Sequence, residues 1–163
     1  MYYPSKIPDM KDIKISKATQ KDRKQLLNWF KFYGLDKLIK SRVDCYLHYH
    51  FTVIAKDKSQ IVGVLQWHIQ ENPACGLSEI EEVLIDEKYR GQGIGSKLVS
   101  FAIDDIRNYF IELNIRPRKV FLFVGKENNP ARNLYEKHGF TLINSIGYLF
   151  HEDKEELFYS LDL

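Results

Sequence analysis

The sequence predicts an α/β fold: a mixed, mostly antiparallel central sheet of about seven strands, with a parallel pair in the middle and helices on both faces. Strand-like runs with period two alternate with helix-like runs of period near 3.6 along the whole chain. One strand–helix–strand crossover joins residues 79–86 to residues 119–124, which implies a parallel pair. The other connections are short enough for antiparallel pairing.

Length and composition limit the classes of protein to which the chain can belong. Its 163 residues suit one domain, residues 1–163, and an aromatic content of 13% argues against global disorder. The net charge of +2 is too small to indicate a nucleic-acid or membrane partner. Cys45 and Cys75 lack metal-finger spacing, so we expect no metal. The absence of a signal core or an apolar bilayer-length run predicts a cytoplasmic protein.

The N-terminal third predicts a strand followed by helices. The strand begins at Ile13, and Thr19 with Asp22 forms a capping-box pattern at the start of the first helix. Gly34 is its expected C-cap, and a second short helix is expected over residues 36–42. His48 and His50 then sit two apart on a strand-like run. The apolar face of the first helix is spaced at three and four residues: Leu26, Trp29, Phe30 and Tyr33.

The middle of the chain predicts a hairpin and a third strand. Residues 51–56 and 61–69 are rich in β-forming residues and flank a polar turn, and residues 78–86 follow after an Asn-Pro loop. A Gly-rich turn then leads into a long amphipathic helix, whose apolar residues repeat at multiples of four: Ile94, Leu98, Ala102, Ile106 and Phe110.

The C-terminal third predicts a strand, a short helix and two more strands. The first strand covers residues 118–124. Asn129 and Pro130 suit the N-cap and first position of a helix that stops at Gly139. The last strands are expected over residues 140–146 and 155–161.

The Gly-rich turn before the long helix carries the clearest functional signal. Gly91, Gly93 and Gly95 allow the backbone to approach a ligand closely, and the helix start behind them presents unpaired N–H groups with a partial positive charge. Together with the cation of Arg90, these features indicate a phosphate cradle. Two nucleotide-binding motifs do not match this turn. A P-loop needs lysine before serine, whereas Ser96 precedes Lys97, and a dinucleotide fingerprint needs glycine where Ser96 stands.

Three segments in the correct order resemble the GNAT family of N-acetyltransferases. Residues 90–95 (Arg-Gly-Gln-Gly-Ile-Gly) match its pyrophosphate motif, and residues 81–86 resemble its fourth strand. Residues 128–140 resemble its Asn-x-x-Ala-x-x-Leu-Tyr-x-x-x-Gly-Phe signature. The resemblance covers about residues 50–162 and departs at Glu87, where many relatives have proline.

The resemblance implies the GNAT fold and a site for acetyl-CoA in a gap between two splayed parallel strands. The pantetheine arm would pair with exposed strand backbone, the pyrophosphate would rest on the Gly-rich turn, and Tyr135 would face the thioester sulfur. The implied cofactor-binding residues are Val83, Leu84, Ile85, Arg90, Gly91, Gln92, Gly93, Ile94, Gly95, Ser96, Asn128, Ala131 and Tyr135.

Acetyl transfer to an amine needs a base, because a primary amine is almost wholly protonated at neutral pH. Glu79, Glu81 and Glu82 lie on the strand beside the expected cleft. Strand alternation places Glu79 and Glu81 on one face and Glu82 on the other, unless a bulge intervenes. We favour Glu81 as the base, followed by Glu79. Tyr135 is the expected acid that protonates the leaving thiolate, and direct transfer in a ternary complex is expected.

The amine acceptor stays open at this point. Several aromatic and histidine side chains either line an acceptor pocket or form core and surface: Tyr46, His48, Tyr49, His50, Trp67 and His68. His138 is interpreted as a surface residue. A non-catalytic acyl-CoA sensor and a nucleotide-binding module stay as alternatives to the enzyme, and a homodimer is left open.

Overall fold

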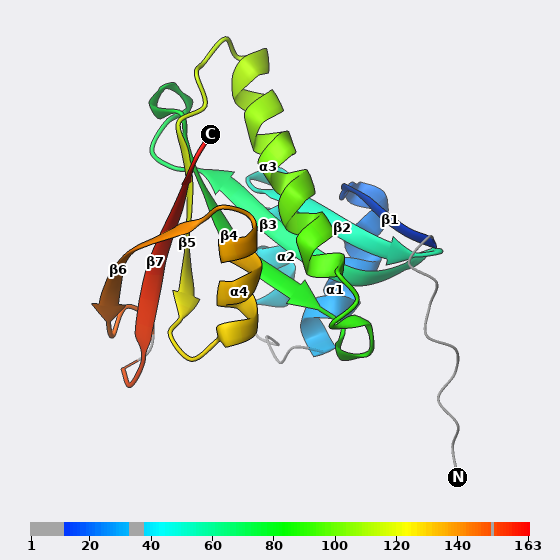
Figure 1. Ribbon diagram of the computed structural model, residues 1–163. Coiled ribbons are helices and arrows are strands. Elements are labelled where there is room, and N and C mark those ends of the chain that lie inside the picture. Colours follow the sequence, from blue (N-terminus) through cyan, green and yellow to red (C-terminus); the bar gives the residue numbers. More distant parts are fainter. Residues whose placement is uncertain (1–11, 33–37, 151) are drawn as a thin grey trace.

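One mixed sheet of seven strands organises the part of the chain that the computed structural model describes, residues 12–32, 38–150 and 152–163 (Figure 1). The strand order is β1-β2-β3-β4-β5-β7-β6, and only the β4–β5 pair of these neighbours is parallel. The predicted fold class is therefore confirmed. The strands are β1 (Ile13–Lys17), β2 (Phe51–Asp57), β3 (Gln60–Ile69), β4 (Leu77–Ile85), β5 (Lys119–Gly125), β6 (Thr141–Gly147) and β7 (Glu155–Asp162).

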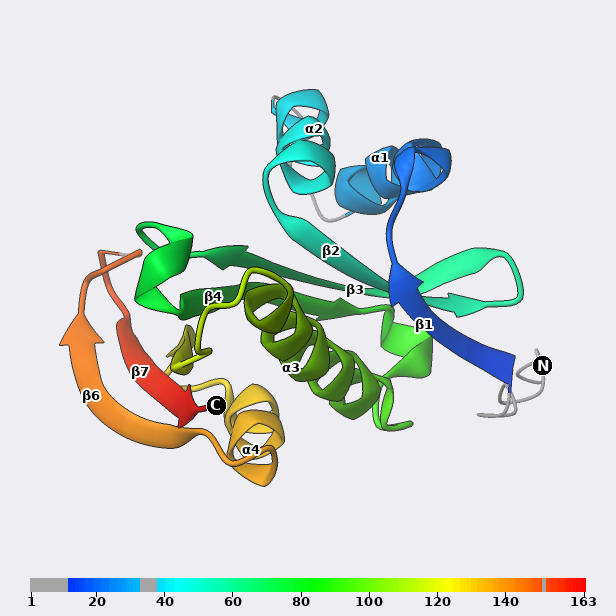
Figure 2. The same ribbon diagram turned by 90° about the horizontal axis from the view of Figure 1, so that it is seen from above.

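Helices cover both faces of the sheet, as predicted (Figure 2). Helices α1 (Arg23–Phe32) and α2 (Ile39–His48) pack on β2, β3 and β4 around a small apolar core. Helices α3 (Ile94–Glu112) and α4 (Asn129–Lys137) cover the other face and enclose the larger core. None of the helices in the described ranges is both long and apolar enough to span a membrane.

The start of the first helix follows the sequence pattern. The Thr19 backbone N–H donates to Asp22 Oδ2 at 2.9 Å, and a short 3₁₀ turn leads into α1. Leu26 and Phe30 are fully buried, so the predicted apolar face is confirmed where the structure describes it. The expected positions of Tyr33 and of the Gly34 cap lie outside the described residues.

Helix α2 corrects the boundary expected from the sequence. The helix was expected over residues 36–42, with a strand-like run around His48, but it continues to His48. The aromatic residues of this run suggested a strand. The positions that are buried, Ile39, Val43 and Tyr46, are nevertheless spaced by four and three residues, so packing against the sheet selects a helix.

The later elements agree with the sequence within one or two residues, apart from one cap. Helix α3 buries its predicted apolar face and begins at Ile94, with Gly93 as the N-cap. The N-cap of α4 is Asn128 rather than Asn129, because Asn128 Oδ1 accepts from the Ala131 N–H at 3.3 Å. Gly139 follows the helix with a φ of 86°, which suits its predicted stop position.

The parallel strands β4 and β5 pair over only three residues. The ladder runs from Leu77 opposite Lys119 to Glu79 opposite Phe121 and then stops. Strand β5 continues its pairing with β7 as far as Gly125, and β4 continues its pairing with β3 as far as Ile85. The two central strands therefore separate beyond Glu79, and this splay lies beside the start of α3.

Candidate active site

A β-bulge at Glu81 gathers three carboxylates on one face of β4. Glu82 pairs with Gln66 and Ile80 pairs with Trp67, so Glu81 has no partner on β3. Ile80 and Val83 both contact the α3-side core, which leaves the two residues between them on the opposite face. The bulge that the sequence expectation allowed for is therefore present: it adds one residue to the strand and places Glu82 on the same face as Glu79 and Glu81.

Glu79 and Glu81 each contact a histidine that the sequence left unassigned. Glu81 Oε2 lies 3.0 Å from His50 Nδ1, and this contact lowers the pKa of Glu81 below its ordinary value. Glu79 Oε2 lies 3.6 Å from His68 Nε2 and accepts from the Gln70 amide at 2.7 Å. Burial raises the pKa of Glu79. The two carboxylates therefore differ in basicity although they stand side by side.

Glu82 is held by a cation and a phenol from α2. Arg42 donates to Glu82 Oε2 at 3.0 Å and to the Tyr46 hydroxyl at 2.6 Å. Burial raises the pKa of Glu82, opposed by the charge of Arg42. Tyr46 is buried and forms part of the α1–α2 core. Glu82 is thus occupied by protein partners, which leaves Glu79 and Glu81 as the candidates for proton transfer.

His50 and His68 stack on each other beside the carboxylates, with ring centroids 4.8 Å apart. Burial, followed by the proximity of His50, lowers the pKa of His68, so this ring is neutral at neutral pH. The sequence offered His50 and His68 only as candidates to line a pocket. Their contact with each other depends on the pairing of β2 with β3, which the sequence alone does not give. With Glu81 they offer three metal-ligand atoms within 4.8 Å of one another. The expectation of no metal stays a prediction.

The Gly-rich turn presents backbone donors at the start of α3. No backbone N–H from residue 91 to residue 96 donates to an acceptor in the described part of the chain. Gly91 and Gly93 have φ values of 73° and 78°, a backbone region that favours glycine. These free donors lie at the positive end of a helix 19 residues long, which suits a phosphate.

Side chains around this turn are fixed by local contacts. Arg90 Nε donates to the Ile85 carbonyl at 3.1 Å, which holds the exposed guanidinium at the end of β4. The Gln92 amide donates to the Lys88 carbonyl at 2.9 Å. His138 is half-buried rather than at the surface, and its Nε2 lies 2.8 Å from Ser96 Oγ. That contact links α4 to the cradle and was not anticipated.

Gly95 has a packing role as well as its expected place in the cradle. A Cβ atom built there would lie 3.2 Å from Leu134 Cδ2, so α3 and α4 approach each other closely at this point. Leu134 itself packs on the larger core. Two of the three segments that resemble the family, residues 90–95 and 128–140, therefore lie against each other in the folded protein.

Tyr135 lies on α4 and packs in the larger core. It is buried, its ring meets Phe140 edge to face at 5.8 Å, and burial raises the pKa of its phenol to about 12. Burial alone accounts for this shift, and no hydrogen bond to the Tyr135 hydroxyl contributes to it within the described residues. Ala131 packs partly on the same core, and the Asn128 side chain caps α4. The raised pKa keeps the phenol protonated at neutral pH.

The strand residues expected to bind pantetheine lie along the splay. Val83 and Ile85 turn their side chains to the α3-side core, while Leu84 packs on the α1–α2 core. No ladder pair joins this part of β4 to β5 in the described ranges. The cradle thus lies near one end of the opening and the carboxylate cluster lies on one face of it.

Comparisons with known proteins agree with this geometry. The model of the acetyltransferase (GNAT) family matches residues 20–140. A mycothiol acetyltransferase from Corynebacterium glutamicum (strain R) is 38% identical over 89 residues, which are 55% of this chain but only 27% of that protein. The chain thus spans about a quarter of the length of the mycothiol acetyltransferases that it matches.

Solved structures with low sequence identity share the fold. The ribosomal-protein-S5-alanine acetyltransferase from Vibrio fischeri superimposes with a TM-score of 0.77 at 16% identity, covering 94% of each chain. A structure from Salmonella typhimurium with its cofactor acetyl-CoA gives a TM-score of 0.76 at 16% identity, covering 93% of this chain and 94% of that one.

Proposed function

The chain belongs to the acetyltransferase (GNAT) family, and we propose that it transfers the acetyl group of acetyl-CoA to a primary amine by direct attack in a ternary complex. One observation carries the proposal: the β4–β5 splay has free backbone donors near one end and a carboxylate–histidine cluster on one face. The donors suit the pyrophosphate of acetyl-CoA, and the cluster suits an ammonium group that must lose a proton.

The proposed base is Glu81 with its partner His50. The carboxylate is ionised at neutral pH because the contact with His50 lowers its pKa, so it attracts an ammonium ion. A proton released by the amine passes to this pair directly or through water. Glu79, with its raised pKa, is the second candidate.

The rest of the transfer follows from atom balance. The amine nitrogen attacks the thioester carbonyl carbon, the C–N bond forms, and the C–S bond breaks. A backbone N–H near Leu84 is proposed to stabilise the oxyanion. Tyr135 gives its proton to the departing thiolate, and its pKa of about 12 keeps that proton in place until it is needed. The acylated nitrogen loses its second proton, which restores the Tyr135 phenol directly or through water, and the proton taken up by Glu81 passes to solvent. The products are an N-acetyl amine, free CoA and one proton.

The test combines binding and turnover. Acetyl-CoA at 100 times its Kd should stabilise the protein by about 2.7 kcal/mol in a thermal-shift assay, whereas ATP and NAD should not. Release of CoA in the presence of a primary amine, measured with a thiol reagent, should then follow the concentration of the amine. Binding without transfer to any amine would favour the sensor, and a preference for ATP or NAD would favour the nucleotide module.

Arg90 provides a prediction of moderate size. Arg90→Ala should weaken acetyl-CoA binding by about 1–2 kcal/mol, because the variant loses a charge-assisted contact with phosphate. The loss, measured by calorimetric titration, should shrink between about 0.05 and 0.5 M salt, since part of it is screened attraction. Arg107→Ala is the matched control: Arg107 is an exposed arginine on α3 paired with Asp104. A loss of affinity in Arg90→Ala that does not change with salt concentration would indicate that Arg90 acts through packing instead.

A further inference from the structure

Four phenylalanines form an apolar wall on the open part of the sheet. We define the aromatic wall as Phe121 and Phe123 of β5, Phe158 of β7 and Phe150 of the β6–β7 connection. Phe123 stacks on Phe158 with ring centroids 5.2 Å apart, and Phe121 and Phe150 lie 5.6 and 5.8 Å from Phe158 and Phe123. None of the four belongs to either apolar core.

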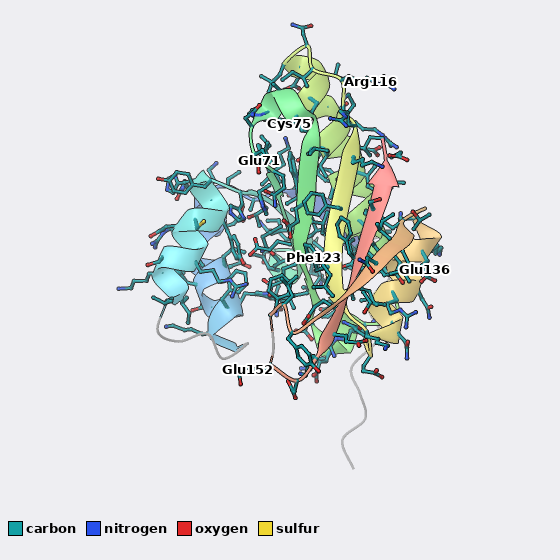
Figure 3. All side chains as sticks on the ribbon, turned by 90° about the vertical axis from the view of Figure 1, so that its left-hand side faces the viewer. Glu71, Cys75, Arg116, Phe123, Glu136 and Glu152 are labelled. Carbon is teal, nitrogen blue, oxygen red and sulfur yellow. The ribbon has the colours of Figure 1, made fainter. Side chains whose placement is uncertain are left out.

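The wall faces the same side of the sheet as the carboxylates. Val120, Leu122 and Val124 of β5 point into the α3-side core, so Phe121 and Phe123 between them point the other way. Helices α1 and α2 cover only the β2–β4 part of that side. Figure 3 shows Phe123 between those helices and the β6–β7 end of the sheet.

Strand register places the wall directly beside the carboxylate cluster. Phe121 is the ladder partner of Glu79 in the short β4–β5 pair, and both side chains lie on the side of the sheet away from α3. Phe150 is 62% exposed and contacts Phe123, so the wall presents apolar surface to solvent as a contiguous patch. A charged region and an aromatic region therefore adjoin at the splay.

We propose that the acceptor is an arylalkylamine: a primary ammonium joined by a short chain to an aromatic ring. This inference rests on the proposed function and names its substrate class. The ammonium lies against Glu79 and Glu81, and the ring packs on the aromatic wall. The chemistry of the transfer is unchanged, since the same C–N bond forms and the same C–S bond breaks.

Charge in the site also disfavours an acceptor that carries its own carboxylate. The cluster holds Glu79, Glu81 and Glu82. Among the arginines and lysines of the described residues, Arg42 alone contributes to the pKa values of these carboxylates, which it lowers. Its guanidinium is already paired with Glu82. A free α-amino acid would bring a further anion to this cluster, on which no second arginine or lysine of the described residues acts. An amine lacking the carboxylate is therefore the better substrate.

The experiment compares three acceptors with the full chain and acetyl-CoA. The expected kcat/KM for 2-phenylethylamine is at least about 10-fold above that for propylamine, which lacks the ring. It is also at least about 10-fold above that for phenylalanine, which adds the carboxylate. Phe123→Ala should remove most of the advantage over propylamine while leaving the KM for acetyl-CoA unchanged. Phe123→Leu, which keeps apolar volume, should remove part of it.

A matched control and the contrary outcomes keep the two proposals separable. Ile111→Ala removes an exposed apolar side chain from α3, away from the aromatic wall. It should leave kcat/KM unchanged for both 2-phenylethylamine and propylamine. Equal kcat/KM for propylamine and 2-phenylethylamine overturns the arylalkylamine inference but leaves acetyl transfer standing. Equal use of phenylalanine, or acetylation of peptide amines alone, overturns it in the same way. Failure to bind acetyl-CoA or to acetylate any amine overturns the proposed function itself.

Discussion

Gly93→Asp should weaken acetyl-CoA binding by about 10³-fold while the protein stays folded. Gly93 is the N-cap of α3 and lies among the free N–H donors of the cradle. Two charges about 4 Å apart at a protein surface interact by about 4 kcal/mol, which corresponds to that factor. The new carboxylate would also accept the helix N–H groups that the pyrophosphate needs, since aspartate is a favoured N-cap. Calorimetric titration with acetyl-CoA measures the loss.

The matched control separates charge from shape. Gly93→Asn has nearly the same size, tolerates the φ of 78° at least as well, and carries no charge. It should lose far less affinity than Gly93→Asp, and the difference between the two should shrink in high salt. Equal losses for both variants would mean that only volume matters at this position. Unchanged affinity in both would contradict the assignment of the cradle.

Much of the fold could be predicted from local patterns. Apolar residues at multiples of four predict the long helix α3, and the strand–helix–strand crossover that contains it predicts a parallel pair of strands. Boundaries failed where packing outweighs propensity, as in α2, whose aromatic sequence resembles a strand. The helix is selected by the sheet face it covers, and that face is assembled from residues far along the chain.

The site divides in the same way. Free donors at Gly91–Ser96 depend on a local turn, and so the sequence located them. The bulge at Glu81 depends on register between β3 and β4, and the contact between Glu81 and His50 depends on the pairing of β2 with β3 as well. Alternation along a single strand cannot supply either fact. This is why alternation alone put Glu82 on the other face, and why the sequence offered His50 only as one of several candidates for an acceptor pocket.

The second large effect concerns the proton path. Glu81→Gln should lower kcat for amine acetylation by about 10²–10⁴-fold at neutral pH and spare acetyl-CoA binding, because it keeps the shape of the side chain and removes its charge and basicity. Glu81 has a lowered pKa, so the wild-type carboxylate stays ionised throughout the neutral and alkaline range. Raising the pH should recover part of the variant's kcat, since a larger fraction of the amine is then neutral without help.

Tyr135→Phe provides the contrast that identifies each step. Its kcat should also fall, but alkaline pH should not restore it, because the missing function is donation of a proton. The pKa of Tyr135, about 12, means that the wild-type phenol loses its proton only as the pH rises towards that value, so the wild-type rate has no alkaline decline from this group below about pH 10. No hydrogen bond to its hydroxyl contributes to this pKa among the described residues, so Tyr135→Phe should leave the thermal midpoint nearly unchanged.

The paired pH profiles decide between the assignments. Alkaline rescue of Glu81→Gln alone supports Glu81 with His50 as the base and Tyr135 as the acid. Full activity of Glu81→Gln at neutral pH would move the base to Glu79, whose raised pKa makes it the stronger base of the two, or to a water chain. If Tyr135→Phe were also fully active, the thiolate would have to leave unprotonated or take its proton from solvent. Direct transfer with Tyr135 as the acid would then be wrong for this protein.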